Sequence, residues 1–600
     1  MENGQKKLSE LFGGHKVFNI PDYQRAYAWD DTRQLPEFLE DIENQTLGRD
    51  YFLGTILFQE KGKKGNFEWI DVVDGQQRIT TAIIFMKALL TELKDRITEE
   101  EYEEAGLYML EEAYIQYRKT PKLRVISSDN DFFSNYVLNG GDGKDYITTP
   151  SQRRLYKARM FFENELAGRP VGELLELMNK LDEYTKVLTY SVNDTAEATL
   201  IFETTNDRGK GLTNLEKIKS FLMYKVYLAS GEDVDAYLDS IQVRFADIYR
   251  DLESLDGKTD EDKILQYHCI AFESWSDKED YQQPVSFVKK KVNSLLRKGE
   301  GDKGKAGQEA SRFIMRFSQE LRESFQLMSG VLKSRNAGLL NLMHLDRMGS
   351  FYPLLLKTYK FDKSENKENF DKVCRLLEIF VFRVFVIHQS RSLTGQSRLY
   401  RMARDFSGKF APLFDRLAEL TDTSCSMRMF KDDLAYEAFY EVMGSRDISY
   451  LMWNYENHLR ATENPVCAPM PLAELKGKDS KTRLTVEHIA AQTQKESGTI
   501  VKEPQVLPRI GEKFIENHLH RLGNLTFDPA SANSSKGNKQ VKEKNSKYFS
   551  KAPYKTQNEL ESFLDKERWT AKSIKWREEK IVNFCMKRWC TDYIDEPLMP

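Results

Sequence analysis

The sequence predicts a multidomain α+β protein with strands near both ends of the chain and helices between them. β-rich runs alternate with helical patterns over about the first 230 residues, and helical periodicity dominates from about residue 215 to residue 458. Short β-type runs return at residues 482–488 and 525–527. Because 600 residues exceed what one hydrophobic core organises, we expect three domains, at residues 1–230, 231–460 and 461–600.

The first domain contains a predicted β-hairpin. Tyr51–Phe58 and Phe67–Val73 are rich in β-branched, aromatic and aliphatic residues, and a polar stretch rich in Gly and Lys separates them. Residues 79–97, which follow, have apolar side chains at helical spacing. Two shorter runs, at 122–126 and 186–192, are further strand candidates, and the segments between the strand candidates, such as residues 100–119, read as helix.

The middle domain is predicted to be helical, as the apolar spacing in 214–230, 312–332 and 370–388 indicates. A Gly- and Lys-rich stretch, 296–308, is expected to be a loop. The sequence leaves the role of this domain open, with a clamp and a dimer interface among the alternatives, so a homodimer also stays open.

Composition and charge narrow the class of protein. Hydrophobic residues make up 40% of the chain and charged residues 30%, which is typical of globular proteins. We expect no membrane span and no secretory signal, because the chain has no long apolar run and a polar N-terminus. The six cysteines form no CxxC pair, which favours a reducing cytoplasm. With a net charge of −4, nucleic-acid binding requires local basic patches.

A polar corner follows the second strand of the predicted hairpin. It consists of Asp74, Gly75, Gln76, Gln77 and Arg78. A glycine allows a tight turn close to a ligand, the helix N-terminus presents free N–H groups, and an arginine matches phosphate oxygens. Glutamines suit a base edge, a ribose or a positioned water. The pattern indicates a phosphate site, with a polar helix cap and an exposed salt bridge as the alternative.

Two more polar clusters accompany this corner. The first places Tyr23, Gln24 and Arg25 among aromatic residues, and the second places Asn206 and Arg208 in an Asn-Asp-Arg-Gly sequence. The second cluster leads into a helix with a predicted capping box, Thr213–Glu216. Each cluster alone is ordinary loop or turn chemistry.

The C-terminal region has a second constellation of polar residues. Glu487 and His488 end a predicted strand, Asn524 precedes another, and Asn533 is expected at the start of a lysine-rich helix. Phosphodiester hydrolysis needs an activated water and neutralisation of charge, which a neutral histidine base and a divalent cation supply. Carboxylate and amide oxygens suit Mg²⁺. A Glu-His pair by itself is usually a surface pair, but this spacing favours the functional interpretation.

Basic residues follow this constellation. Residues 531–555 contain seven lysines and one acidic residue. We expect Lys536, Lys539, Lys542 and Lys544 to contact the DNA backbone, which would give salt-dependent affinity independent of base sequence. The alternative is a solvated helix face. His518 and His520 are either ordinary histidines or a second metal pair.

These motifs resemble a known family. The order IPxYQRxYxW, DGQQR and FxxxNDRGxxL, over roughly residues 10–225, resembles the N-terminal domain of GmrS/GmrD-type, or type IV, restriction enzymes. The order EHIxxQ, GNLxF, N and N, over roughly residues 470–555, resembles the HNH, or ββα-metal, nuclease domain of the same family.

The resemblance implies a fold and site residues. It implies a ParB/sulfiredoxin-like first domain that binds or hydrolyses GTP or ATP. The nucleotide would lie at Asp74, Gly75, Gln76, Gln77 and Arg78, with Tyr23, Gln24, Arg25, Asn206 and Arg208 completing the pocket. In the nuclease, the catalytic residues would be His488, as the general base, and Asn524, as the central asparagine that shapes the loop and orients the histidine or the phosphate. Glu487 and Asn533 would be the ligands of Mg²⁺ or Mn²⁺, and Lys544 a DNA contact.

The implied function is a modification-dependent DNA endonuclease of anti-phage defence, regulated by nucleotide. Its substrate would be double-stranded DNA with glucosylated or hydroxymethylated cytosine, or with a phosphorothioate backbone, and the sequence does not select between them. The reader of this modification is the third alternative for the role of the helical middle domain. One alternative is a less selective nickase that the N-terminal domain restrains. The other is a nucleotide-gated DNA-binding protein that does not cleave.

Overall fold

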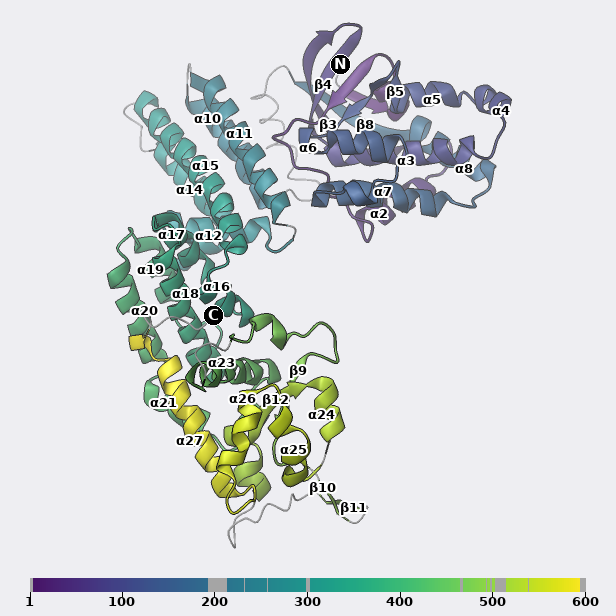
Figure 1. Cartoon of the computed structure of the whole chain (residues 1–600). Helices are drawn as coiled ribbons and strands as arrows, with labels where there is room; N and C mark the ends of the chain where they lie inside the picture. Colours follow the sequence, from purple (N-terminus) through teal and green to yellow (C-terminus); the bar gives the residue numbers. More distant parts are fainter. Residues whose placement is uncertain are drawn as a thin grey trace. The chain divides into compact units, whose positions relative to one another are not determined.

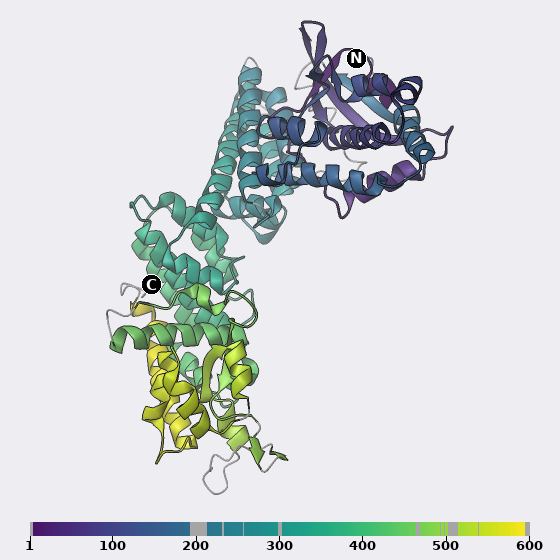
Figure 2. The same ribbon diagram turned by 45° about the vertical axis from the view of Figure 1, so that its right-hand side comes forward.

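A computed structural model describes most of the chain (Figures 1 and 2). The described residues are 4–192, 213–230, 233–255, 257–297, 303–463, 468–492, 494–496, 499–501, 514–537 and 539–593. They form two compact units. Unit 1 comprises Met1–Cys269 and Glu273–Gly330, and unit 2 comprises Ile270–Phe272 and Val331–Pro600. The finer division into three domains stays a prediction.

Unit 1 contains a mixed six-stranded sheet of order β1-β8-β3-β4-β2-β7. The strands are β1 (Gly4–Lys7), β2 (Lys16–Asn19), β3 (Tyr51–Lys64), β4 (Phe67–Asp74), β7 (Leu123–Arg124) and β8 (Thr185–Val192). β3 and β4 are antiparallel, which confirms the predicted hairpin, whereas β8 lies parallel to β3 and β2 parallel to β4. The sheet therefore brings the end of β4 into the interior of the unit.

Helices cover the sheet and share its core. α2 (Gln34–Glu43), α3 (Gln76–Lys94) and α7 (Pro150–Leu166) lie beside the sheet in Figure 1. α3 is buried along most of its length because it packs against both the sheet and α7, as the contact between Phe85 and Phe162 shows. The continuous helix predicted between residues 100 and 119 is wrong: Gly106, at φ 69°, separates α4 (Glu99–Glu104) from α5 (Leu107–Tyr114).

Long helices follow the sheet in the chain. They are α10 (Asn214–Ala229), α11 (Val234–Ser254), α12 (Glu261–Phe272), α14 (Pro284–Arg297) and α15 (Lys303–Lys333). The capping box predicted at the start of α10 is confirmed, since Thr213 accepts from the Glu216 backbone and Glu216 accepts from the Thr213 backbone. Both ends of the loop predicted at 296–308 are helical instead, because α14 extends to Arg297 and α15 begins at Lys303, and residues 298–302 lie outside the described residues.

Unit 2 combines helices with a small sheet. Its helices include α16 (Ala337–His344), α18 (Glu368–Phe380), α20 (Phe410–Ser424), α21 (Met427–Leu434), α23 (Ser445–Glu463), α24 (Ala530–Lys536), α25 (Val541–Lys547) and α27 (Ala571–Arg588). α18 continues as the π-helical segment η6 (Val381–Ile387). The small sheet pairs β9 (Leu484–His488) antiparallel with β12 (Leu525–Pro529).

One hydrophobic cluster holds unit 2 together. It includes Phe380 and Leu451 from the helices, Leu484 and Phe527 from the two strands, and Trp589 at the end of α27. β9 and β12 therefore rest on the helices, as expected for strands without a metal-bound cysteine brace. None of the helices in the described ranges is long and apolar enough to cross a membrane.

Candidate nuclease and nucleotide sites

Strands β9 and β12, with α24 after them, bring together three of the predicted nuclease residues. Glu487 pairs with Thr526, and His488 pairs with Leu525. From α24, the Asn533 amide nitrogen donates to Thr485 Oγ1 at 3.0 Å and to the Val486 carbonyl oxygen at 3.1 Å. Asn533 thus lies against β9 immediately before Glu487. It stands inside α24, so its predicted place at the start of a lysine-rich helix is wrong.

His488 is held neutral by its surroundings. Burial, together with the positive fields of His520 and Lys544, lowers the pKa of its imidazole to about 3. Its Nδ1 faces the Gln492 amide at 3.4 Å, and the Tyr440 ring lies edge-on at 4.4 Å between centroids. Its Nε2 is buried and has no hydrogen-bond partner among the described residues. A neutral imidazole with an unused nitrogen is able to accept a proton.

Glu487 has a buried cationic partner, Lys544 of α25. The Lys544 Nζ pairs with the Glu487 carboxylate and donates to the His488 carbonyl oxygen at 2.9 Å. Burial raises the pKa of Glu487 and lowers the pKa of Lys544, and the attraction between them works against both shifts. The buried Glu487 carboxylate therefore stabilises a positive charge at this position.

The predicted DNA contacts of Lys536 and Lys544 need correction. Both side chains are buried, Lys544 in the pair with Glu487 and Lys536 in a pair with Asp528. An ammonium group buried against a carboxylate is not available to a phosphate. Lys539 is half-buried and donates to the Ser535 carbonyl oxygen and the Tyr548 hydroxyl. Lys542 is exposed, so it remains a candidate for DNA contact.

Asn524 has a positioning role, and its predicted catalytic role is corrected. Its Oδ1 accepts from the Ala490 backbone at 2.9 Å and from the Trp569 indole at 3.1 Å. Its Nδ2 donates to the carbonyl oxygens of Leu519 and Ala490. A fully buried amide with these four bonds cannot touch substrate. It fixes the loop that follows His488.

Sequence reasoning missed the residues that brace this loop. A Cβ on Gly523 would lie 2.0 Å from the Ile574 carbonyl oxygen, so α27 packs directly on the backbone there. From α27, Arg577 donates to the carbonyl oxygens of Gly523 and Leu525. No local motif signals Trp569 or Arg577, because both lie beyond residue 555, where the recognised pattern ends.

The corner at Asp74 joins β4 to α3 with a left-handed glycine. Gly75 has φ 91°, and a Cβ there would lie 3.0 Å from Ile56 Cγ1. Arg78 folds back over β3, where its Nη1 donates to the Thr55 carbonyl oxygen at 2.6 Å. Burial raises the pKa of the Asp74 carboxyl, and the nearby Arg78 guanidinium offsets part of that shift. The corner is thus a compact, partly buried acid–base pair at a helix N-terminus.

The glutamines of the corner differ in their roles. The Gln77 amide accepts from the Ala28 backbone at 2.8 Å and donates to the Ala26 carbonyl oxygen at 3.1 Å, so it holds the segment before α2. Gln24 likewise donates to the Val73 carbonyl oxygen at 2.7 Å. The Gln76 side chain is largely buried and has no hydrogen bond to another described residue. Of the two adjacent glutamines, Gln76 is therefore the one available to a ligand.

Lys219 of α10 joins the first polar cluster to the helices. Its buried Nζ donates to the Tyr23 carbonyl oxygen at 2.7 Å and lies 4.7 Å from the Tyr23 ring centroid. Burial lowers the pKa of Lys219 to about 7. The sequence analysis did not identify this residue. Its position, four residues after Leu215 on an apolar helix face, does indicate a buried lysine.

The remaining predicted residues of the pocket are only partly described. Arg25 is 3.7 Å from Glu261 of α12, in an ion pair. Asn206 and Arg208 lie outside the described residues. The contribution of these three residues to a nucleotide site stays a prediction.

Comparisons with known families match both ends of the chain. Residues 8–223 match the N-terminal domain of the GmrSD restriction endonuclease, and residues 426–584 match the C-terminal domain of GmrSD restriction endonucleases. The chain belongs to the GmrSD restriction endonuclease family. No curated protein matches it. The family resemblance predicted from the motifs is confirmed.

Membership in the GmrSD family implies a DNA substrate and a divalent metal. The donors near β9 fit such an ion. The Glu487 carboxylate supplies a hard oxygen donor once the ion displaces part of its pair with Lys544, and Asn533 adds an amide whose oxygen is not used in its bonds to β9. Oxygen donors of this kind suit a hard ion such as Mg²⁺ or Mn²⁺.

Proposed function

We propose that this GmrSD-family protein is a metal-dependent DNA endonuclease of anti-phage defence, with its cleavage site at β9, β12 and α24. The observation that carries the proposal is the neutral His488, which follows Glu487 in β9 and whose buried Nε2 has no hydrogen-bond partner in the described part of the chain. The two-stranded sheet followed by a helix supports an HNH, or ββα-metal, arrangement.

In this proposal His488 is the general base. Its unpaired Nε2 takes a proton from the attacking water, and the Gln492 amide beside Nδ1 helps fix the ring. Glu487 and Asn533 would hold Mg²⁺ or Mn²⁺, which neutralises charge on the scissile phosphate. Asn524 keeps the loop after His488 in place, and Lys544 must release part of its hold on Glu487 when the metal binds.

The N-terminal corner is proposed to bind GTP or ATP and to regulate cleavage. The free N–H groups of α3, the Arg78 guanidinium and the available Gln76 amide support phosphate and water contacts there. The DNA proposed to be cut is double-stranded and modified, either with glucosylated or hydroxymethylated cytosine or with phosphorothioate linkages. The requirement for a modification would restrict cleavage to foreign DNA in the cytoplasm.

A plasmid cleavage assay tests the proposal. Wild type and His488→Ala are incubated with Mg²⁺ and unmodified, glucosylated-hydroxymethylcytosine or phosphorothioate DNA, each with and without GTP or ATP. We expect wild type to cut one class of modified DNA. Loss of a general base should slow His488→Ala by about 10²–10⁴-fold while DNA binding persists.

The other outcomes select among the alternatives. Cutting of every DNA would favour a less selective nickase, and gel shifts without cutting would favour a nucleotide-gated DNA-binding protein. Unchanged cutting by His488→Ala would refute the assignment of the base.

A further inference from the structure

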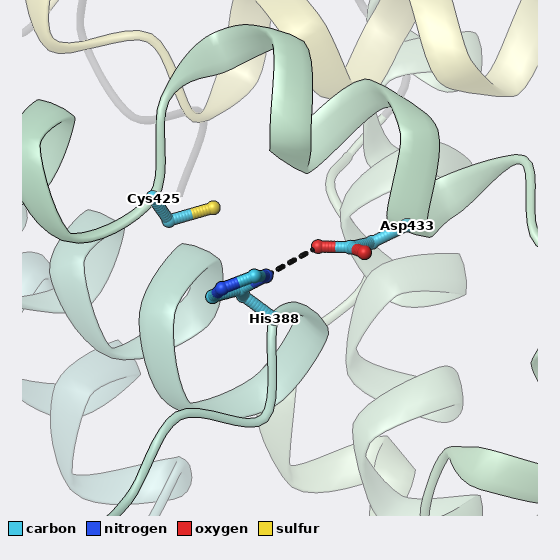
Figure 3. Close-up of side chains that lie close together, drawn as sticks. All are labelled: His388, Cys425 and Asp433. Carbon is cyan, nitrogen blue, oxygen red and sulfur yellow. Dashed lines mark hydrogen bonds and ion pairs between the residues drawn. The ribbon is translucent and has the colours of Figure 1, made fainter.

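A group of metal-ligating side chains lies in the helical part of unit 2, apart from β9. His388, Cys425 and Asp433 offer one ligand atom each, and these atoms all lie within 4.8 Å of one another. Among the described residues, this is the group of three or more such side chains that could hold an ion. Figure 3 shows the imidazole, the thiol and the carboxylate pointing toward one space.

Three separate elements supply the three side chains. His388 directly follows η6, Cys425 lies between α20 and α21, and Asp433 is in the last turn of α21. The backbone N–H of His388 donates to the Arg383 carbonyl oxygen at 2.9 Å, which fixes the end of the π-helical segment. The ligand atoms are therefore positioned by the fold and not by a local loop.

The geometry is close to what a tetrahedral ion requires. Bond lengths of about 2.3 Å to sulfur and about 2.0–2.2 Å to nitrogen and oxygen place tetrahedral ligand atoms roughly 3.3–3.6 Å apart. His388 Nδ1 and Asp433 Oδ2 are now 2.8 Å apart, in a hydrogen bond. Small side-chain movements would open this pair and bring all three atoms to the distances needed for binding.

The surroundings leave one side of the group open to water. The Cys425 thiol is buried, whereas the side chains of His388 and Asp433 retain 28% and 33% of their exposure. Three protein ligands and one accessible position match a site with water as the fourth ligand. Thiolate and imidazole donors together favour a transition metal over Mg²⁺.

Charge also balances at this position. The buried Arg383 guanidinium donates to the Cys425 carbonyl oxygen and is paired with Asp422 at 2.8 Å, so its charge is compensated. A divalent ion with one thiolate, one carboxylate and a neutral imidazole gives a neutral complex. Binding would release the proton of the Cys425 thiol, and the hydrogen bond between His388 and Asp433 would open, with the neutral imidazole keeping its one N–H on the ring nitrogen that does not bind the ion.

We propose that His388, Cys425 and Asp433 bind a zinc-class divalent ion, which fixes α21 to the end of η6. α21 contacts α27, and Phe430 of α21 lies against Trp589. Immediately after α21, the Ala435 carbonyl oxygen accepts from Arg521, close to the loop that holds His488. The ion therefore links η6, the turn before α21 and α21 through its three protein ligands, and its fourth position stays open to water.

Cobalt substitution of the full-length protein tests this site. Reduced, metal-free protein is titrated with Co²⁺, and the thiolate-to-cobalt charge-transfer absorption is recorded. Glu487 and Asn533 contain no sulfur, so metal at the nuclease site does not produce this absorption. We expect about one equivalent of Co²⁺ to produce it, and Zn²⁺ to displace it.

Matched variants separate this site from adventitious binding. The absorption should disappear in Cys425→Ser and persist in Cys590→Ser and Glu487→Gln. Asp433→Asn should weaken the affinity by about tenfold or more. If Cys425→Ser does not fold, His388→Gln, whose ring is partly exposed, takes its place, and it should lose at least as much affinity.

Two results would overturn the proposal. One is a wild-type protein that gives no thiolate absorption with Co²⁺. The other is an absorption that persists in Cys425→Ser or an affinity that is unchanged in Asp433→Asn.

Discussion

At the scale of single residues, burial decides what the charged groups near β9 can do. Lys544 and Lys542 are two positions apart on α25, yet the first is buried against Glu487 and the second is exposed. Burial also keeps His488 neutral, and its Nε2 has no hydrogen-bond partner among the residues that the structure describes. Identical side chains therefore have different chemistry within one helical turn.

The lysines of α25 give a direct comparison. Lys544→Met should lower the free energy of unfolding of unit 2 by about 3–5 kcal/mol, because it leaves the Glu487 carboxylate buried without its cation. Lys542→Met should change it by less than about 0.5 kcal/mol. Urea denaturation measures both. Equal stability for the two variants, with an equal loss of DNA affinity, would mean that Lys544 is a surface contact after all.

The pKa of His488 predicts a pH dependence of stability. Its folded pKa of about 3 lies below the ordinary value of 6.5, so the unfolded chain binds the proton more readily. The contribution of the neutral His488 to the free energy of unfolding is complete above pH 6.5. It is lost as the pH falls toward 3, by up to about 1.4 kcal/mol per pH unit. In EDTA, His488→Gln should show a shallower decline than wild type over this range. Parallel declines would contradict the buried, neutral histidine.

At the scale of elements, the corner between β4 and α3 depends on one backbone conformation. Gly75 combines a positive φ with a close approach to Ile56. Strand propensity and apolar spacing were enough to predict the hairpin and the helix on either side. The hydrogen bond from Arg78 to the Thr55 carbonyl oxygen was not predictable, because only the pairing of β3 with β4 brings Thr55 near Arg78.

Two glycines at helix N-termini make a matched pair. Gly106 also precedes a helix with a positive φ, but a Cβ there meets nothing within 4 Å. Gly106→Ala should cost about 1–2 kcal/mol from backbone strain alone. Gly75→Ala should cost about 1–3 kcal/mol more because its Cβ presses on Ile56. Thermal unfolding compares them, and equal costs would mean that Ile56 moves aside freely.

At the scale of the whole molecule, the two units have separate hydrophobic cores. One buried cluster spans Leu8 to Val187, and another spans Val331 to Trp589. The two family matches fall in different units, with the corner proposed to bind nucleotide in the first and the residues proposed to cleave DNA in the second. Ligands of the two sites should therefore stabilise different parts of the chain.

Calorimetry should resolve two unfolding transitions. GTP or ATP at about 100 times its dissociation constant should stabilise the transition that Gly75→Ala lowers, by about 2.7 kcal/mol. Gln76→Ala should reduce this effect without lowering the transition itself, because the amide has no partner in the described protein. A nucleotide effect confined to the other transition would contradict the corner as the binding site.

The sequence by itself determined the family, the hairpin and the helical middle. It also predicted that Glu487, His488 and Asn533 lie near one another. These follow from local patterns, since turn residues, periodicity and motif spacing act over a few residues. Only the tertiary structure decided that Lys544 is a buried partner of Glu487 and that Asn524 is fully bonded. It alone brought His388 and Asp433, 45 residues apart, to 2.8 Å. Burial and long-range pairing depend on how distant segments pack, and no local pattern encodes them.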